Sequence, residues 1–158
     1  GRNNFTSGTY DFGATDAPYS STDKKPASFT YVPLVGGPIA IMFNVEGVKS
    51  LNLTAKVLGG IMNGRYTTWN DEAIQSLNPK AKLPSAKINV YYRSGSSGTT
   101  QAFANYLRGN GASGWKDNGT WATASSQSSP VGSSAAMTAK ARVLRTRLAE
   151  RFEVMGKL

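Results

Sequence analysis

A short loop of small residues between a strand pattern and a helix pattern constrains the fold of this 158-residue chain most strongly. Residues 88–92 have the composition of a strand, and residues 100–107 have apolar side chains at helical spacing. The loop between them reads Arg93-Ser94-Gly95-Ser96-Ser97-Gly98-Thr99. Because a strand that leads through a short loop into a helix is the repeating unit of α/β proteins, the sequence predicts an α/β fold.

Five other segments have the pattern of a helix or a strand. Apolar spacing predicts helices over 53–62 and 69–77, each closed by an asparagine followed by glycine or proline. Strands are predicted over 9–14, 30–35 and 38–45. Helices that alternate with strands again favour an α/β sheet.

The last fifty residues change in composition. Residues 109–134 are rich in glycine, serine and threonine, with Trp115 and Trp121 as the only large anchors. The alternation of arginine with apolar residues over 141–152 predicts an amphipathic basic helix. Residues 140–158 account for +4 of the net charge of +9, so the basicity is partly a property of this tail.

The sequence contains no histidine and no cysteine. These absences exclude a thiol nucleophile, a Ser-His-Asp triad and imidazole or thiolate ligands for zinc. The nine acids are scattered, and the adjacent Asp71 and Glu72 fit the first turn of a helix. We therefore expect no enzyme activity, no metal and no cofactor. The longest apolar stretch, residues 39–43, is too short to span a membrane.

The small-residue loop has what an anion site needs. Small residues let backbone N–H groups approach a tetrahedral oxyanion, and the start of the next helix adds free donors and partial positive charge. Ser97 and Thr99 can donate through their hydroxyls, and Arg93 can form a charge-assisted pair. The alternative is a serine-rich surface loop in which Thr99 only caps the helix. A nucleotide-binding P-loop is disfavoured, because its Gly-Lys-Ser/Thr ending is absent.

Two motifs, with shorter matches between them, carry a resemblance to a known family. They are Tyr92-Arg93-Ser94-Gly95-Ser96-Ser97-Gly98-Thr99-Thr100-Gln101-Ala102-Phe103 and Asp11-Phe12-Gly13-Ala14-Thr15-Asp16-Ala17-Pro18. Residues 35–40, 61–71 and 77–79 match in order and spacing. Over residues 8–108 the chain resembles PstS-type periplasmic phosphate-binding proteins.

The resemblance implies a periplasmic-binding-protein-like (type II) fold, mostly the second lobe with part of the first. Residues 1–38 would be a partial first lobe and crossover, 39–134 the second α/β lobe, and 135–158 a basic tail. It further implies an extracytoplasmic receptor, lipid-anchored if at all through a segment outside this sequence, that binds inorganic phosphate and delivers it to the membrane permease of an ABC transporter. The matched phosphate-binding positions are Asp16, Arg93, Ser97, Gly98 and Thr99.

Asp16 also has a physical rationale of its own. A carboxylate accepts a hydrogen bond from a protonated phosphate oxygen but repels fully ionised sulfate. Its alternative role is a helix cap, with Pro18 near a first helical position. Gly95 departs from the family pattern, which usually has an aspartate there that would orient the arginine.

Two further functions remain open at this point. The family's first phosphate-contacting loop and its closing segments have no counterpart, so a missing segment or second chain would complete the fold. Without those parts, and with Gly95 in place of the usual aspartate, the alternative function is a sensor or an interaction or assembly module that does not bind phosphate tightly. Nucleic-acid binding would use the basic tail with Trp115 and Trp121, but these lie apart in the sequence, so no nucleic acid is expected as a partner.

Overall fold

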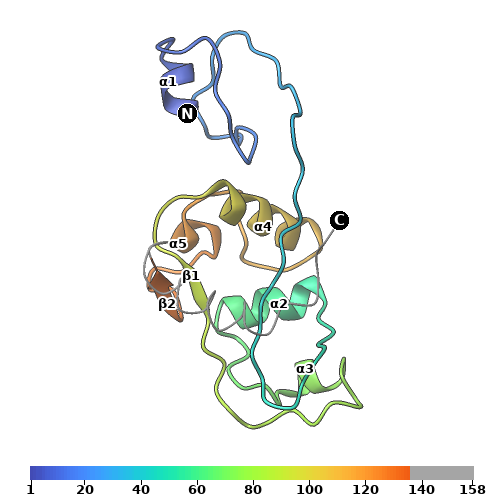
Figure 1. Ribbon diagram of the computed structural model, residues 1–158. Helices are drawn as coiled ribbons and strands as arrows, with labels where there is room; N and C mark the ends of the chain where they lie inside the picture. Colours follow the sequence, from blue (N-terminus) through green and yellow to red (C-terminus); the bar gives the residue numbers. More distant parts are fainter. Residues whose placement is uncertain (136–158) are drawn as a thin grey trace.

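The computed structural model describes residues 1–135 as five helices and a two-stranded sheet (Figure 1). In chain order they are α1 (Arg2–Thr6), α2 (Ala55–Met62), α3 (Glu72–Gln75), β1 (Tyr91–Arg93), α4 (Gly98–Gly109), α5 (Trp121–Ala124) and β2 (Ser133–Ala135). The basic helix predicted over 141–152 lies outside the described residues.

The core forms where α4 packs against α2 and α5. Leu107 of α4 is fully buried, and Phe103 meets Trp115 edge to face with ring centroids 5.8 Å apart. Trp115 and Trp121 are 4% and 6% exposed. They therefore anchor the glycine- and serine-rich segment as predicted. Neither ring is available to stack on a base, which removes the aromatic part of the nucleic-acid hypothesis.

The helix predicted over 53–62 is confirmed as α2, with the Thr54 hydroxyl accepting from the Val57 N–H at 3.3 Å. Glycines disfavour a helix by about 1 kcal/mol each, yet α2 contains two. The reason is close packing. A Cβ at Gly59 would lie 2.7 Å from the Ala112 Cβ and 2.9 Å from Nε1 of Trp115. Because Gly59 has no side chain, α2 can approach Ala112 and Trp115 closely.

The sheet pairs β1 with β2 in parallel, with Tyr91 opposite Ser133. The predicted strand at 88–92 is shifted towards the loop, because Ile88 instead donates its N–H to the Thr67 carbonyl at 2.7 Å. Sequence patterns did not predict β2, since Ser133 and Ser134 have low strand propensity. The pairing places the loop that follows β1 at the carboxyl end of a parallel strand.

The chain before α2 differs most from the sequence-based expectations. Residues 2–6 form α1, and residues 9–14 form no strand. Residues 30–35 and 38–45 form no strand. Among the described residues, no backbone hydrogen bond involves residues 24–44. The β-forming residues are present, but the described part of the chain supplies no neighbouring strand for them.

Aromatic and ionic contacts hold α1 to the residues that follow it. Phe5 of α1 meets Phe29 edge to face with ring centroids 6.3 Å apart, and Arg2 Nη1 pairs with Asp23 Oδ2 at 3.1 Å. The Ser20 backbone N–H and the positive charge of Arg2 lower the pKa of Asp23 below its ordinary value. The ionised form of Asp23 is therefore the one that the folded chain favours.

We expect Asn78→Ala to lower the free energy of unfolding by about 3 kcal/mol, because it leaves buried backbone groups unpaired. Asn78 is 5% exposed; its amide accepts from Asn52 N–H at 2.7 Å and donates to the Asn52 and Ile74 carbonyls, each at 2.9 Å. Urea unfolding measures the change. Asn110→Ala is the control, since the exposed Asn110 makes one side-chain bond, and a loss as large there would contradict the explanation.

Asp23→Asn tests the ionic contact through its pH dependence. A lowered pKa in the folded state stabilises the chain above the ordinary value of 3.8, and that stabilisation is lost as the pH falls through the folded pKa. The wild type should therefore be more stable than the variant at pH 7, and the difference should disappear at low pH. Thermal unfolding across this range measures it, and a pH-independent difference would assign the effect to packing alone.

Candidate functional site

The loop after β1 ends in a fixed geometry at Ser97, the N-cap of α4. The Ser97 side chain makes no capping bond to the helix. Its oxygen instead accepts from Arg93 Nη1 at 3.1 Å, and its backbone N–H donates to the Gly119 carbonyl at 2.9 Å. The arginine at the end of the strand and the start of the helix are thereby held together across the loop.

The first turn of α4 offers free donors. The Gln101 N–H bonds to the Ser97 carbonyl at 3.1 Å, whereas the N–H groups of Gly98, Thr99 and Thr100 have no partner within residues 1–135. Such groups carry the partial positive charge of a helix N-terminus, and α4 has twelve residues to generate it. The turn can therefore accept an anion. Thr99 lies inside the helix and does not cap it, so the alternative role considered for Thr99 is wrong.

Asp16 reaches the same turn from the other end of the described chain. A Cβ built on Gly98 would lie 2.8 Å from the Asp16 Cβ and 3.3 Å from the Ala17 nitrogen. No helix begins at Ala17 or Pro18, so the helix-cap interpretation of Asp16 is wrong. The structure thus brings Asp16, Arg93, Ser97, Gly98 and Thr99 to one place. Their role as phosphate ligands stays a prediction.

Gly95 stands open beside these residues. A Cβ at this position would have no heavy atom within 4 Å among the described residues, and the backbone is not left-handed. The aspartate that is usual at this point of the family motif would therefore fit. Its absence leaves Arg93 with the Ser97 hydroxyl as its side-chain partner in the described chain.

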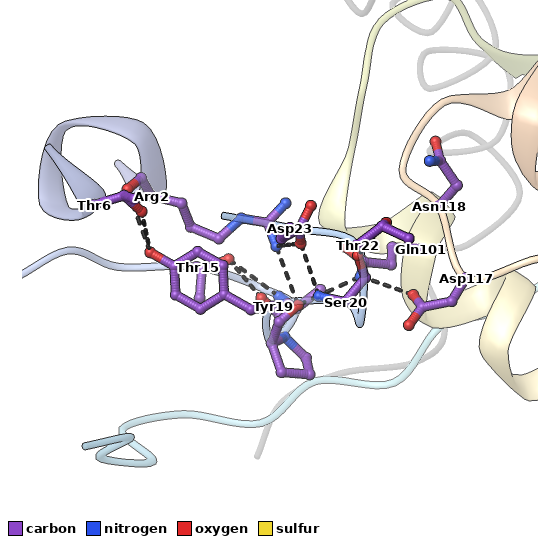
Figure 2. Close-up of polar contacts among 12 residues, drawn as sticks. Arg2, Thr6, Thr15, Tyr19, Ser20, Thr22, Asp23, Gln101, Asp117 and Asn118 are labelled. Atoms are coloured by element: carbon purple, nitrogen blue, oxygen red, sulfur yellow. Dashed lines mark hydrogen bonds and ion pairs between the residues drawn. The ribbon is translucent and has the colours of Figure 1, made fainter. Parts of the chain in front are cut away.

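Sequence patterns did not predict the polar cluster behind the loop (Figure 2). Gln101 is 2% exposed, and its Nε2 donates to Asp117 Oδ1 at 2.8 Å and to the Pro18 carbonyl at 3.3 Å. Asn105 Nδ2 also donates to Asp117, at 3.0 Å. A lone acid in a serine-rich segment gives no signal of such partners. Gly119 was missed as well, although a Cβ there would lie 2.8 Å from Ser96 Oγ.

Residues 93–96 of the loop and Thr99 are exposed, whereas Ser97 is buried. A recess of about 260 Å³ is found at Arg2, Tyr19 and Asp23, and a shallower one of about 580 Å³ at Asn70 and Pro79. Neither is lined by the residues around Gly98. The two recesses therefore belong to other parts of the described chain.

Two other features of residues 1–135 bear on function. No three acidic side chains gather there in a group that could hold a metal ion. Of the helices in this part of the chain, none combines the length and the apolar character needed to cross a bilayer.

Comparison with known proteins gives matches along most of the chain. The family described as the PBP superfamily domain matches residues 1–154. Phosphate-binding protein PstS 3 of Mycobacterium leprae is 41% identical over 113 residues, which are 68% of this chain and 31% of that protein. PstS3 of Mycobacterium bovis is 39% identical over 127 residues, 77% of this chain and 33% of the relative. PstS of Xylella fastidiosa is 40% identical over 101 residues, which are 63% of this chain and 28% of that protein.

The matched residues span about a third of the length of these relatives. The family match, by contrast, extends over nearly the whole sequence and includes both loops that meet at Gly98. The chain belongs to the PBP superfamily, the periplasmic-binding-protein-like domains.

Proposed function

We propose that this chain provides one wall of an extracytoplasmic receptor for inorganic phosphate that serves an ABC transporter. The observation that carries the proposal is the meeting of three kinds of group around Gly98: free backbone donors, the Arg93 guanidinium and the residue Asp16, whose Cβ lies against the glycine. Relatives that are about 40% identical are named phosphate-binding proteins, which supports phosphate as the anion.

Each group has a distinct part in holding phosphate. The N–H groups of Gly98 and Thr99 and the Thr99 hydroxyl donate to the anion's oxygens, and Arg93 adds a charge-assisted bond. Asp16 accepts from the oxygen that carries the proton. These groups bind and orient the anion and cleave no bond, so the proposed protein is a binding protein and not an enzyme.

The division into lobes belongs to the same proposal. Residues 1–38 would contribute to the first lobe and the crossover, and residues 39–134 would form the second lobe. Residues 93–96 and Thr99 are exposed, which supports the view that an opposite wall would come from polypeptide beyond the described residues. The membrane permease would then contact the closed, phosphate-loaded receptor.

Arg93→Gln should weaken phosphate binding by about 10- to 100-fold, because it removes a hydrogen bond to a charged group. Isothermal titration calorimetry with inorganic phosphate at fixed salt measures the loss. Arg108→Gln is the matched control, since Arg108 lies in the last turn of α4, at the opposite end from Gly98, and its replacement removes the same charge. Equal losses in both variants would mean that only net charge attracts phosphate. Absence of any phosphate heat from the wild-type chain would contradict the proposed function.

Asp16→Asn should reduce the preference for phosphate over sulfate by about tenfold, because an amide can donate to sulfate where the carboxylate repels it. Competition of sulfate against phosphate, followed by calorimetry at pH 7, gives the ratio of the two affinities. Asp11→Asn is the control, since Asp11 is an exposed acid in the same segment. An unchanged ratio in Asp16→Asn would remove Asp16 from the site.

A further inference from the structure

A single hydrogen bond joins the segment that carries Asp16 to the rest of the described chain. It runs from Gln101 Nε2 to the Pro18 carbonyl at 3.3 Å and connects residues 83 positions apart. The other hydrogen bonds of residues 1–31 remain inside that segment, as far as the described residues show. The position of Asp16 at α4 therefore depends on this bond and on the contact at Gly98.

The surroundings of Gln101 fix which way its amide faces. Both partners of Nε2, the Pro18 carbonyl and the Asp117 carboxylate, accept hydrogen bonds and do not donate them. The amide nitrogen must therefore point at them. Figure 2 shows the bond from Gln101 to Asp117. Asp117 is itself held by Asn105 at 3.0 Å, so Gln101 rests on a partner that is already positioned.

The segment that Gln101 holds is a compact turn. The Thr15 hydroxyl donates to the Ala17 carbonyl at 2.8 Å, and Ala17 is 3% exposed. One end of this turn contacts Gly98 through Asp16, and the other end contacts Gln101 through Pro18. Both contacts are made to the first turn of α4, the same turn that has the free donors.

We propose that Gln101, itself positioned by Asp117, is a positioning residue that docks the turn at residues 15–18 onto α4 and thereby holds Asp16 beside the anion. The docking is supported by the Gln101–Pro18 hydrogen bond and by the contact of Asp16 with Gly98. Its effect on phosphate rests on the proposed function. Gln101 does not touch the anion; it acts through the carbonyl of Pro18.

The test reverses the direction of the hydrogen bond between positions 101 and 117 and removes the hydrogen bond to the Pro18 carbonyl. Gln101→Glu places a carboxylate against Asp117 and has no donor for the Pro18 carbonyl. Gln101→Glu combined with Asp117→Asn restores the bond between positions 101 and 117, because the new amide can donate to the new carboxylate. The Pro18 carbonyl stays without its donor in both variants. Stability and docking are thereby separated.

Three measurements on the full chain distinguish the outcomes: thermal unfolding, phosphate calorimetry, and hydrogen exchange of residues 15–22 without ligand. In the double variant we expect unfolding close to wild type, about tenfold faster exchange in residues 15–22 and about tenfold weaker phosphate binding. Gln75→Glu is the matched control. Gln75 Nε2 also donates to two carbonyls, of Asn78 and Ala81, but far from this turn, so exchange at 15–22 should not change.

Wild-type exchange at residues 15–22 in the double variant would overturn the inference, whatever phosphate does. Faster exchange with unchanged phosphate affinity would overturn the link to Asp16. If the wild-type chain binds no phosphate but exchange still responds, the docking stands and the proposed function fails.

A second pair of variants tests the docking from its other end. Gly98→Ala places a Cβ against Asp16, whereas Gly109→Ala, at the last residue of α4, meets no atom within 4 Å. Only Gly98→Ala should speed exchange at residues 15–22. Equal exchange rates at residues 15–22 in the two variants would contradict the docking.

Discussion

The packing of α4 on Trp115 and Trp121 is the contact on which the rest of the structure depends. Phe103 stacks over Trp121 at 6.3 Å and meets Trp115 edge to face, while Leu107 is fully buried one turn later. Burial of such aromatic side chains is worth several kcal/mol in total, on the order of 2 kcal/mol for each. This packing fixes the direction of the helix axis, and with it the direction in which the free N–H groups of the first turn point.

Small residues bring the remaining pieces to that turn. Gly59 lets α2 approach Trp115, Gly119 lets the loop before α5 reach Ser96, and Gly98 lets Asp16 approach the helix. At each place a methyl group would come within 3 Å of another atom. Real Cβ atoms essentially never approach other atoms so closely, so these glycines are required by contact distance rather than by a left-handed backbone.

The sequence predicted the parts of the structure that local chemistry determines. Helix α2 follows from its apolar spacing and its Thr54 cap, and α4 from the small-residue loop before it. The five site residues were named from motifs, and the structure brings them together. Strand β2 could not be predicted, because two serines pair there through their backbone alone. Gln101 and Asp117 were missed for a related reason, since two polar residues sixteen positions apart meet only through tertiary packing.

The uncharged stretch from Pro26 to Val45 has a consequence for how the molecule associates. Residues 26–44 make no backbone hydrogen bond among the described residues, and Val35 is 97% exposed. Such a stretch leaves its backbone N–H and C=O groups free to pair with another extended polypeptide. Pro33 and Pro38 lack N–H groups, so each interrupts the row of donors. Uninterrupted pairing is left to the residues after Pro38, and a strand that paired there would join the exposed side chains of Ile39, Ile41 and Met42 to the faces of a sheet.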